Sequence, residues 1–154
     1  MNVTKGLCVL ALTSVCALFA PAAAVQAAPL PLALAADTVL GGPCVLSSNF
    51  KAGDKIIFRV RVLDTATGEP VDADGLKSLV IKMSDGSEHA AKFGPHPPKD
   101  PIAGYYWTLA WTVPADYPTG SFPYTVVATS LSGETVTYVP FEAPKSQLMI
   151  VAAQ

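Results

Sequence analysis

The sequence predicts an all-β protein, folded as an antiparallel β-sandwich of seven to nine short strands. Two observations favour this class. Apolar and polar residues alternate with a period of two in several short segments, as they do along strands that bury one face. Segments rich in proline, glycine and aspartate separate these runs, and after residue 27 no stretch keeps the 3.6-residue period of a helix.

The first 27 residues have the pattern of a secretory signal peptide. Lys5 gives a short basic start, an apolar run of about 15 residues covers 6–20, and Val25-Gln26-Ala27 offers small residues at the −3 and −1 positions of a cleavage site. The apolar run is shorter than the ~20 residues that cross a bilayer. We therefore predict a periplasmic or secreted protein with no membrane span after cleavage.

Residues 28–42 are rich in alanine, leucine and proline and show no usable period, so we expect a flexible leader. Thr38 to Leu40 is the one part of it that could begin an edge strand. A single domain is predicted over 43–154, which is an ordinary domain length. Lysine and arginine number 10 against 12 acidic residues, with no basic block. Nucleic acid and anionic membrane are therefore poor partners.

The clearest strand covers 55–63, where large apolar residues alternate with Arg59 and Arg61. A second strand is predicted over 79–83 and a third over 88–93, and Asp85-Gly86 between them is a strong signal for a tight hairpin. The residues expected on the inward faces are Ile56, Phe58, Val60, Val62, Leu79, Ile81, Met83, His89, Ala91 and Phe93.

The segment 93–101, FGPHPPKDP, holds four prolines in nine residues. Proline removes a backbone donor and fixes φ, so the segment is neither a helix nor a central strand. We expect an exposed, stiff, extended loop.

Two strands after this loop carry most of the aromatic residues. In the first, 105–112, alternation places Trp107 and Trp111 in the core. In the second, Phe122, Tyr124, Val126 and Ala128 share one face. Strand-like segments over 134–141 and 147–151 complete the chain. Short strands at this spacing, joined by turns, are typical of sandwiches of the immunoglobulin or fibronectin type.

Three runs of the sequence resemble bacterial immunoglobulin-like modules of the adhesin, macroglobulin and fibronectin-III-like kinds. They are KAGDKIIFRVRVLDTATGEPVD, VIKMSDG and WTVPADYPTGSFPYTVVATSLSGETVTY, which lie within 51–138. These motifs concern backbone turns and packing, so the resemblance implies a fold and no activity. Such modules serve as spacers, stalks or protein-binding accessory domains.

The favoured interpretation is therefore an exported, non-catalytic binding or accessory module for a protein partner, with no cofactor. No motif of a nucleophile elbow, zinc helix, P-loop or dinucleotide fold occurs in the sequence. A stiff proline loop beside tyrosines makes a good contact surface, because it loses little entropy on docking. The partner-binding candidates are His96, Pro97, Pro98, Tyr105 and Tyr106.

Copper binding is the alternative, because sulfur and imidazole ligands suit that metal. The residues that could supply them are Cys44, Met83, His89 and His96. Cys8 and Cys16 leave with the signal peptide, so Cys44 is an odd cysteine in an exported chain. It is buried and inert, pairs between chains in a Cys44-linked dimer, or binds metal.

Overall fold

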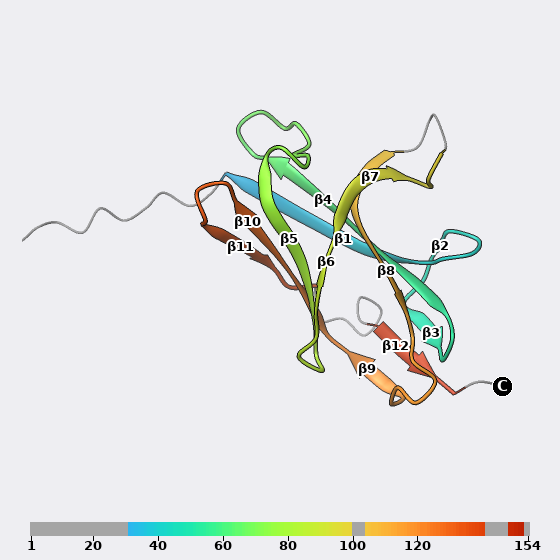
Figure 1. Ribbon diagram of the computed structural model, residues 1–154. Helices are drawn as coiled ribbons and strands as arrows, with labels where there is room; N and C mark the ends of the chain where they lie inside the picture. The colour runs from blue at the N-terminus through green and yellow to red at the C-terminus, as the bar shows by residue number, and fades with distance from the viewer. Residues whose placement is uncertain (1–30, 100–103, 141–147, 153–154) are drawn as a thin grey trace, which may run out of the picture.

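The computed structural model describes residues 31–99, 104–140 and 148–152 of the chain, and in these segments all regular structure is β (Figure 1). The all-β prediction is confirmed; the predicted signal peptide lies outside the described residues. Twelve strands are described rather than seven to nine, since several are only two or three residues long. They are β1 Leu32–Leu40, β2 Val45–Leu46, β3 Asn49–Lys51, β4 Lys55–Asp64, β5 Leu76–Met83, β6 Glu88–Ala90, β7 Lys92–His96, β8 Gly104–Thr112, β9 Gly120–Phe122, β10 Tyr124–Ser130, β11 Thr135–Tyr138 and β12 Leu148–Val151.

The strands form two larger sheets and one small one. The five-stranded sheet has the order β2-β1-β4-β8-β7, and the four-stranded sheet has the order β11-β10-β5-β6. Every neighbouring pair in these two sheets is antiparallel. The small sheet, β3-β12-β9, lies at the bottom of the view in Figure 1 and contains one parallel pair, β3 with β12.

The core lies between the two larger sheets, which makes the molecule an antiparallel-rich sandwich. Phe58 on β4 and Tyr124 on β10 meet edge to face across it, with ring centroids 5.1 Å apart. Aromatic pairs in this geometry add to the stability gained by burying their area. The other buried residues come from both sheets and from the small sheet below them: Phe50, Ile56, Val60, Val62, Leu76, Leu79, Ile81, Met83, Ala91, Trp107, Val113, Val126, Ala128, Leu148 and Ile150.

Strand β4 shows why the period-two pattern forms this fold. Its even-numbered residues from Ile56 to Val62 face the core, while Arg59 and Arg61 face outward. Strands β1 and β8 pair with its two edges, so β4 is central in its sheet. The predicted hairpin at Asp85-Gly86 is also confirmed: Gly86 has φ = +85° and its N–H donates to the carbonyl of Met83 at 3.0 Å.

The expectation of a flexible leader over 28–42 is wrong for residues 32–40. They form β1, a nine-residue strand paired with β4 along its whole length, from Leu32 opposite Asp64 to Leu40 opposite Ile56. The domain therefore includes this strand and does not begin at residue 43. Alanines alternate with leucines at the start of β1, so both faces of the strand are apolar. The sequence therefore lacks the alternation of apolar and polar residues that would predict a strand.

The segment 88–96 is one strand in the prediction and two in the structure. Strand β6 pairs with β5 in the four-stranded sheet, and β7 pairs with β8 in the five-stranded sheet. Only Ala91 separates them, and its N–H donates to the carbonyl of Leu79 at 2.9 Å. The chain thus crosses from one sheet to the other and closes one side of the sandwich.

The crossing also corrects the prediction of an exposed loop over 93–101. Residues 93–96 belong to β7, and Pro95 is accommodated because β7 is the edge of its sheet. Residues 97–99 are exposed and outside any strand, as expected for a loop. Residues 100 and 101 are not among the described ones.

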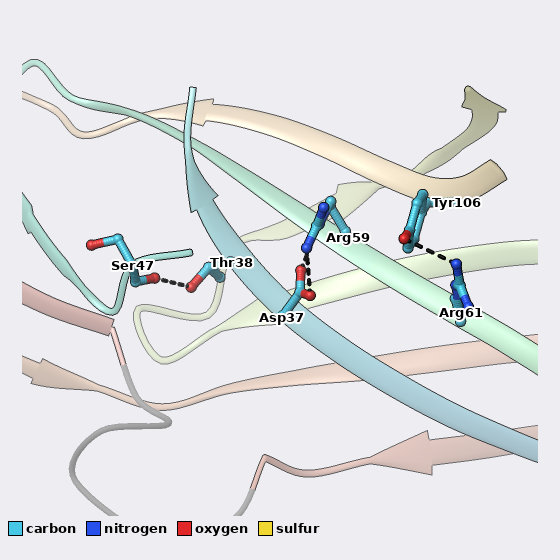
Figure 2. Close-up of polar contacts among 6 residues, drawn as sticks. All are labelled: Asp37, Thr38, Ser47, Arg59, Arg61 and Tyr106. Atoms are coloured by element: carbon cyan, nitrogen blue, oxygen red, sulfur yellow. Dashed lines mark hydrogen bonds and ion pairs between the residues drawn. The ribbon is translucent and has the colours of Figure 1, made fainter. Parts of the chain in front are cut away.

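The side of the sandwich opposite the crossing is less tightly closed. Strands β1 and β11 face each other there, and a hollow of about 280 Å³ lies between them, lined by Thr38, Leu46, Tyr124, Tyr138 and Pro140 among others. The residue that follows β2 is bonded back to β1: the Thr38 hydroxyl donates a hydrogen bond of 2.6 Å to the carbonyl of Ser47 (Figure 2).

Replacing Phe58 with alanine is expected to lower the free energy of unfolding by about 3–5 kcal/mol, because the ring is fully buried and bridges the two sheets. Urea unfolding followed by circular dichroism measures the loss. Leu131→Ala is the control: that side chain is 68% exposed, and a change within about 0.5 kcal/mol is expected. Similar losses for both variants would contradict this account of the core.

Candidate functional site

Strands β4 and β8 separate at one end of the five-stranded sheet. Their pairing stops at Val60 opposite Trp107, although β4 continues to Asp64 and β8 begins three residues earlier, at Gly104. In Figure 1 the two strands diverge toward the end that carries the loop between β4 and β5. The backbone edge of β4 that β8 leaves is therefore available to another segment.

The loop after β4 fills part of this space. Strand β1 occupies one edge of β4 as far as Asp64, so the returning residues Pro70 and Val71 take the other edge. The Val71 N–H donates to the carbonyl of Val62 at 2.8 Å. The Trp107 indole N–H donates to the Val71 carbonyl at 3.0 Å. These bonds fix the loop between the two strands and satisfy the indole of a buried tryptophan.

A cleft of about 290 Å³ remains between the loop, β4, β7 and β8. We call it the end cleft. It is lined mainly by apolar side chains: Leu63, Pro70, Val71, Phe93, Tyr105 and Trp107. Tyr105 stands at its rim with 60% of its surface exposed, and its ring packs on Phe93 at a centroid distance of 5.7 Å. Phe93 packs in turn on Trp107 at 5.6 Å, so the exposed ring rests on a supported stack.

The outward face of the same sheet carries an arginine–tyrosine cluster made of Arg59, Arg61 and Tyr106, with Asp37 beside it (Figure 2). Both guanidinium groups lie over the Tyr106 ring, at 5.1 Å for Arg59 and 4.8 Å for Arg61. The Arg61 Nη2 also donates to the Tyr106 hydroxyl at 3.0 Å. Cation–π contacts of this kind hold guanidinium groups in place.

The two arginines differ in charge compensation. Arg59 makes a bidentate pair with Asp37, with Nε to Oδ1 and Nη2 to Oδ2 both at 2.7 Å, and this hydrogen bonding raises the pKa of Arg59. Asp37 lies opposite Arg59 in the β1–β4 register, so the pair is set by strand pairing. Arg61 has no carboxylate within ion-pair distance among residues 31–99, 104–140 and 148–152.

The structure places the five predicted partner-binding residues at the same end of the β7–β8 pair, where Pro95 lies opposite Tyr105 and His96 opposite Gly104, but not on one face. Tyr105 is exposed on the end cleft, and Pro97 and Pro98 are exposed after β7. Tyr106 is half-buried and lies on the outward face, in the arginine–tyrosine cluster. His96 is only 8% exposed, so this side chain is largely buried and not at the surface expected for a recognition contact, which stays a prediction. The difference arises because residues 92–96 pair with β8, with His96 opposite Gly104, instead of lying in a loop.

His96 has an unusual environment for an imidazole. Its Nε2 atom is buried and makes no hydrogen bond in the described part of the chain. Burial lowers the pKa of His96, the positive charge of Arg59 lowers it further, and Asp37 acts in the opposite direction. The neutral imidazole is therefore the form that the fold accommodates.

The four residues of the copper alternative do not gather at one place. Met83 and His89 belong to the β5–β6 hairpin, His96 to β7 in the other sheet, and Cys44 to the turn between β1 and β2. His89 lies within 3.0 Å of the Ser87 hydroxyl. Among the residues that the structure describes, no group of three or more histidine, cysteine, aspartate or glutamate side chains is arranged to hold a metal ion.

Cys44 is a free, half-buried thiol in the described segments and has φ = +53°, in the left-handed region. The neighbouring Val45 and Leu46 on β2 are exposed apolar residues. The predicted Cys44-linked dimer stays a prediction.

Sequence reasoning missed three contacts of the site. They are the ion pair of Asp37 with Arg59, the stacking of Tyr106 with Arg61, and the hydrogen bond from the Trp107 indole N–H to the Val71 carbonyl. The outward alternation of Arg59 and Arg61 was visible in the sequence. Their partners were not, because Asp37 lies 22 residues from Arg59 and Tyr106 lies 45 residues from Arg61. Strand register places Asp37 opposite Arg59, and Arg61 and Tyr106 each lie one residue beyond the last pair of β4 and β8.

Comparison of the chain with protein-family models, with curated proteins and with solved structures finds no match. Of the residues described, none belongs to a helix long and apolar enough to cross a membrane.

Stability is expected to fall as the pH falls from about 7.5 to about 5, because the folded state binds a proton at His96 less readily than the unfolded state. The unfolded imidazole takes up its proton near the ordinary pKa of 6.5, and the folded one takes it up only at lower pH. His96→Phe removes this difference and should flatten the decline, without loss of stability at pH 7.5, since the buried Nε2 has no partner to lose.

Urea unfolding of both proteins at several pH values measures this effect, with His89→Gln as the control that keeps His96. A His96→Phe profile parallel to the wild-type profile would show that His96 is not the source of the decline.

Proposed function

We propose that the protein is an exported, non-catalytic binding or accessory module of the immunoglobulin-like kind, which recognises a protein partner at the end cleft. The observation that carries the proposal is Tyr105, 60% exposed at the rim of an apolar cleft and supported from below by the Phe93 ring. Tyrosine is enriched among the residues that contribute most to binding in protein interfaces, and here it borders an apolar cleft.

The arrangement suits docking because its parts are fixed before a partner arrives. The Phe93 and Trp107 rings support Tyr105, and the indole hydrogen bond to Val71 holds the opposite wall of the cleft. Side chains that are already ordered lose less conformational entropy on binding. Tyrosine also offers apolar area together with a hydroxyl, which makes it a frequent anchor in protein interfaces.

Strand order supports the immunoglobulin-like part of the proposal. The four consecutive strands β1-β4-β8-β7 correspond in order to A-B-E-D of that fold, and β11-β10-β5 correspond to G-F-C. Strand β6, which neighbours β5, then corresponds to an additional strand next to strand C. Modules of this class present partner sites at the ends of the sandwich, where the end cleft lies.

The chemistry of the cleft fits recognition better than catalysis. Its polar groups are the guanidinium of Arg61 and the hydroxyl of Tyr105. None of the described residues that line it is a histidine, cysteine, aspartate, glutamate, serine, threonine or lysine, the side chains that most often act as general bases or nucleophiles. We therefore assign no reaction to this site.

A photo-crosslinking amino acid in place of Tyr105 is expected to capture one partner protein from an extract of exported host proteins. The same amino acid in place of Val139 is the matched control, because Val139 is 59% exposed but follows β11 of the other sheet. Mass spectrometry of the adducts identifies the partner. Equal adducts from both positions, or none from position 105, would refute the proposed site.

The Tyr105→Ala variant is expected to compete with cross-linking about 30-fold less well than the unlabelled wild type, a loss typical of an interface anchor. Its free energy of unfolding should change by only about 0.5 kcal/mol, since the side chain is mostly exposed. Undiminished competition by this variant would exclude Tyr105 as the anchor.

A further inference from the structure

We infer that Arg61 and Tyr106 form a binding point for a carboxylate of the partner, beside the end cleft. The inference rests on the proposed function and adds the chemistry of the ligand: an acidic residue with a large apolar neighbour. It depends on three features of the arginine–tyrosine cluster, namely its free donors, its net charge and the space around those donors.

The first feature is a pair of neighbouring side chains with hydrogen-bond donors left over. Arg61 donates an Nη2 hydrogen bond to the Tyr106 hydroxyl oxygen at 3.0 Å, so that oxygen acts as the acceptor. The proton of the hydroxyl group is then left for another acceptor, and none occurs among the described residues. Arg61 keeps further N–H groups of its planar fork, which match the two oxygens of a carboxylate. An anion placed there accepts from both residues.

The second feature is the net charge of the cluster. The charge of Arg59 is neutralised by the bidentate pair with Asp37, whereas Arg61 has no acidic partner in the described segments. One positive charge is thus uncompensated, which suits a singly charged anion. The Asp37 carboxylate nearby disfavours a doubly charged phosphate more strongly than a carboxylate. The charge balance therefore favours an acidic side chain over a phosphate group.

The third feature is the space around these donors. A surface hollow of about 310 Å³ lies over the cluster, lined by Ala35, Ala36, Asp37, Arg59, Arg61 and Tyr106. The alanines of β1 leave the guanidinium groups accessible, and Figure 2 shows Arg61 and Tyr106 reaching toward each other from β4 and β8. Gly104 is needed for this placement: a Cβ atom there would lie 2.9 Å from Cε2 of Tyr106 and 3.3 Å from Nη2 of Arg61.

The end cleft adds the second half of the ligand. Arg61 lines both the hollow and the end cleft and is the residue that joins them, because the consecutive side chains of Tyr105 and Tyr106 point to opposite faces of β8. A carboxylate bound by Arg61 therefore lies beside the mouth of the apolar cleft. The ligand that uses both surfaces is an extended segment with an acidic residue next to a large apolar one.

The test is a titration of the purified domain with N-acetyl-Glu-Phe-amide, N-acetyl-Gln-Phe-amide and inorganic phosphate, followed by the NMR signal of the Arg61 Nε–H group and, in the wild type and every variant, by the backbone amide signals of β8. We expect the Glu dipeptide to bind at least about tenfold more tightly than the Gln dipeptide, because only its carboxylate accepts charge-assisted hydrogen bonds. Inorganic phosphate should bind more weakly than the Glu dipeptide.

Two variants probe the donors, and one is a matched control. Arg61→Gln should abolish the preference for Glu over Gln, and Tyr106→Phe should reduce it severalfold while leaving the ring under the guanidinium groups. Lys92→Gln removes an exposed cation on β7 of the same sheet and should leave the preference unchanged. No shift of the Arg61 signal, equal binding of the two dipeptides, a preference for phosphate, or an unchanged preference in Arg61→Gln would each overturn the inference.

The two proposals fail in different ways. If cross-linking at position 105 succeeds and the dipeptides show no preference, the carboxylate inference is wrong and the proposed function stands. If the Glu dipeptide binds selectively and no cross-link forms at position 105, the carboxylate site stands and the proposed protein partner is wrong.

Discussion

The two-residue alternation along β4 is the constraint on which the rest of the molecule depends. It directs Ile56, Phe58, Val60 and Val62 into the core and Arg59 and Arg61 to the outward face. A shift of register by one residue would bury both arginines and expose the aromatic contact between the sheets. The same pattern that closes the sandwich therefore also sets the spacing of the arginine–tyrosine cluster.

The parts of the fold that could be predicted are those in which one face is apolar and the other is polar. Strands β4, β5, β8 and β10 satisfy this condition, and so does the Asp85-Gly86 turn, whose glycine adopts the backbone conformation that the turn needs. Strand β1 was missed because its leucines and alanines are apolar on both faces. The division of 88–96 into β6 and β7 was missed because the choice of partner strand is made by tertiary packing.

The site was predictable to a smaller extent, and for a physical reason. Tyr105 was a candidate because it follows a proline-rich segment, but the period of its strand left core and surface both open, and the structure has it 60% exposed. The burial of His96 and the contacts of Tyr106 depend on how β7, β8 and β4 lie against one another. Side chains such as Asp37 and Arg59 meet because antiparallel register places them opposite each other, and no local pattern records that register.

The passage of the chain through Ala91 makes the two sides of the sandwich mechanically unequal. On that side the backbone runs directly from β6 in one sheet to β7 in the other. The hydrogen bond from the Ala91 N–H to the Leu79 carbonyl holds this crossing against β5. On the other side, no backbone pairing joins β1 to β11 within the described segments, and a hollow lies between them. The buried rings nearest to solvent on that side are therefore those of Tyr124 and Tyr138, which line the hollow, whereas the backbone itself closes the side at Ala91.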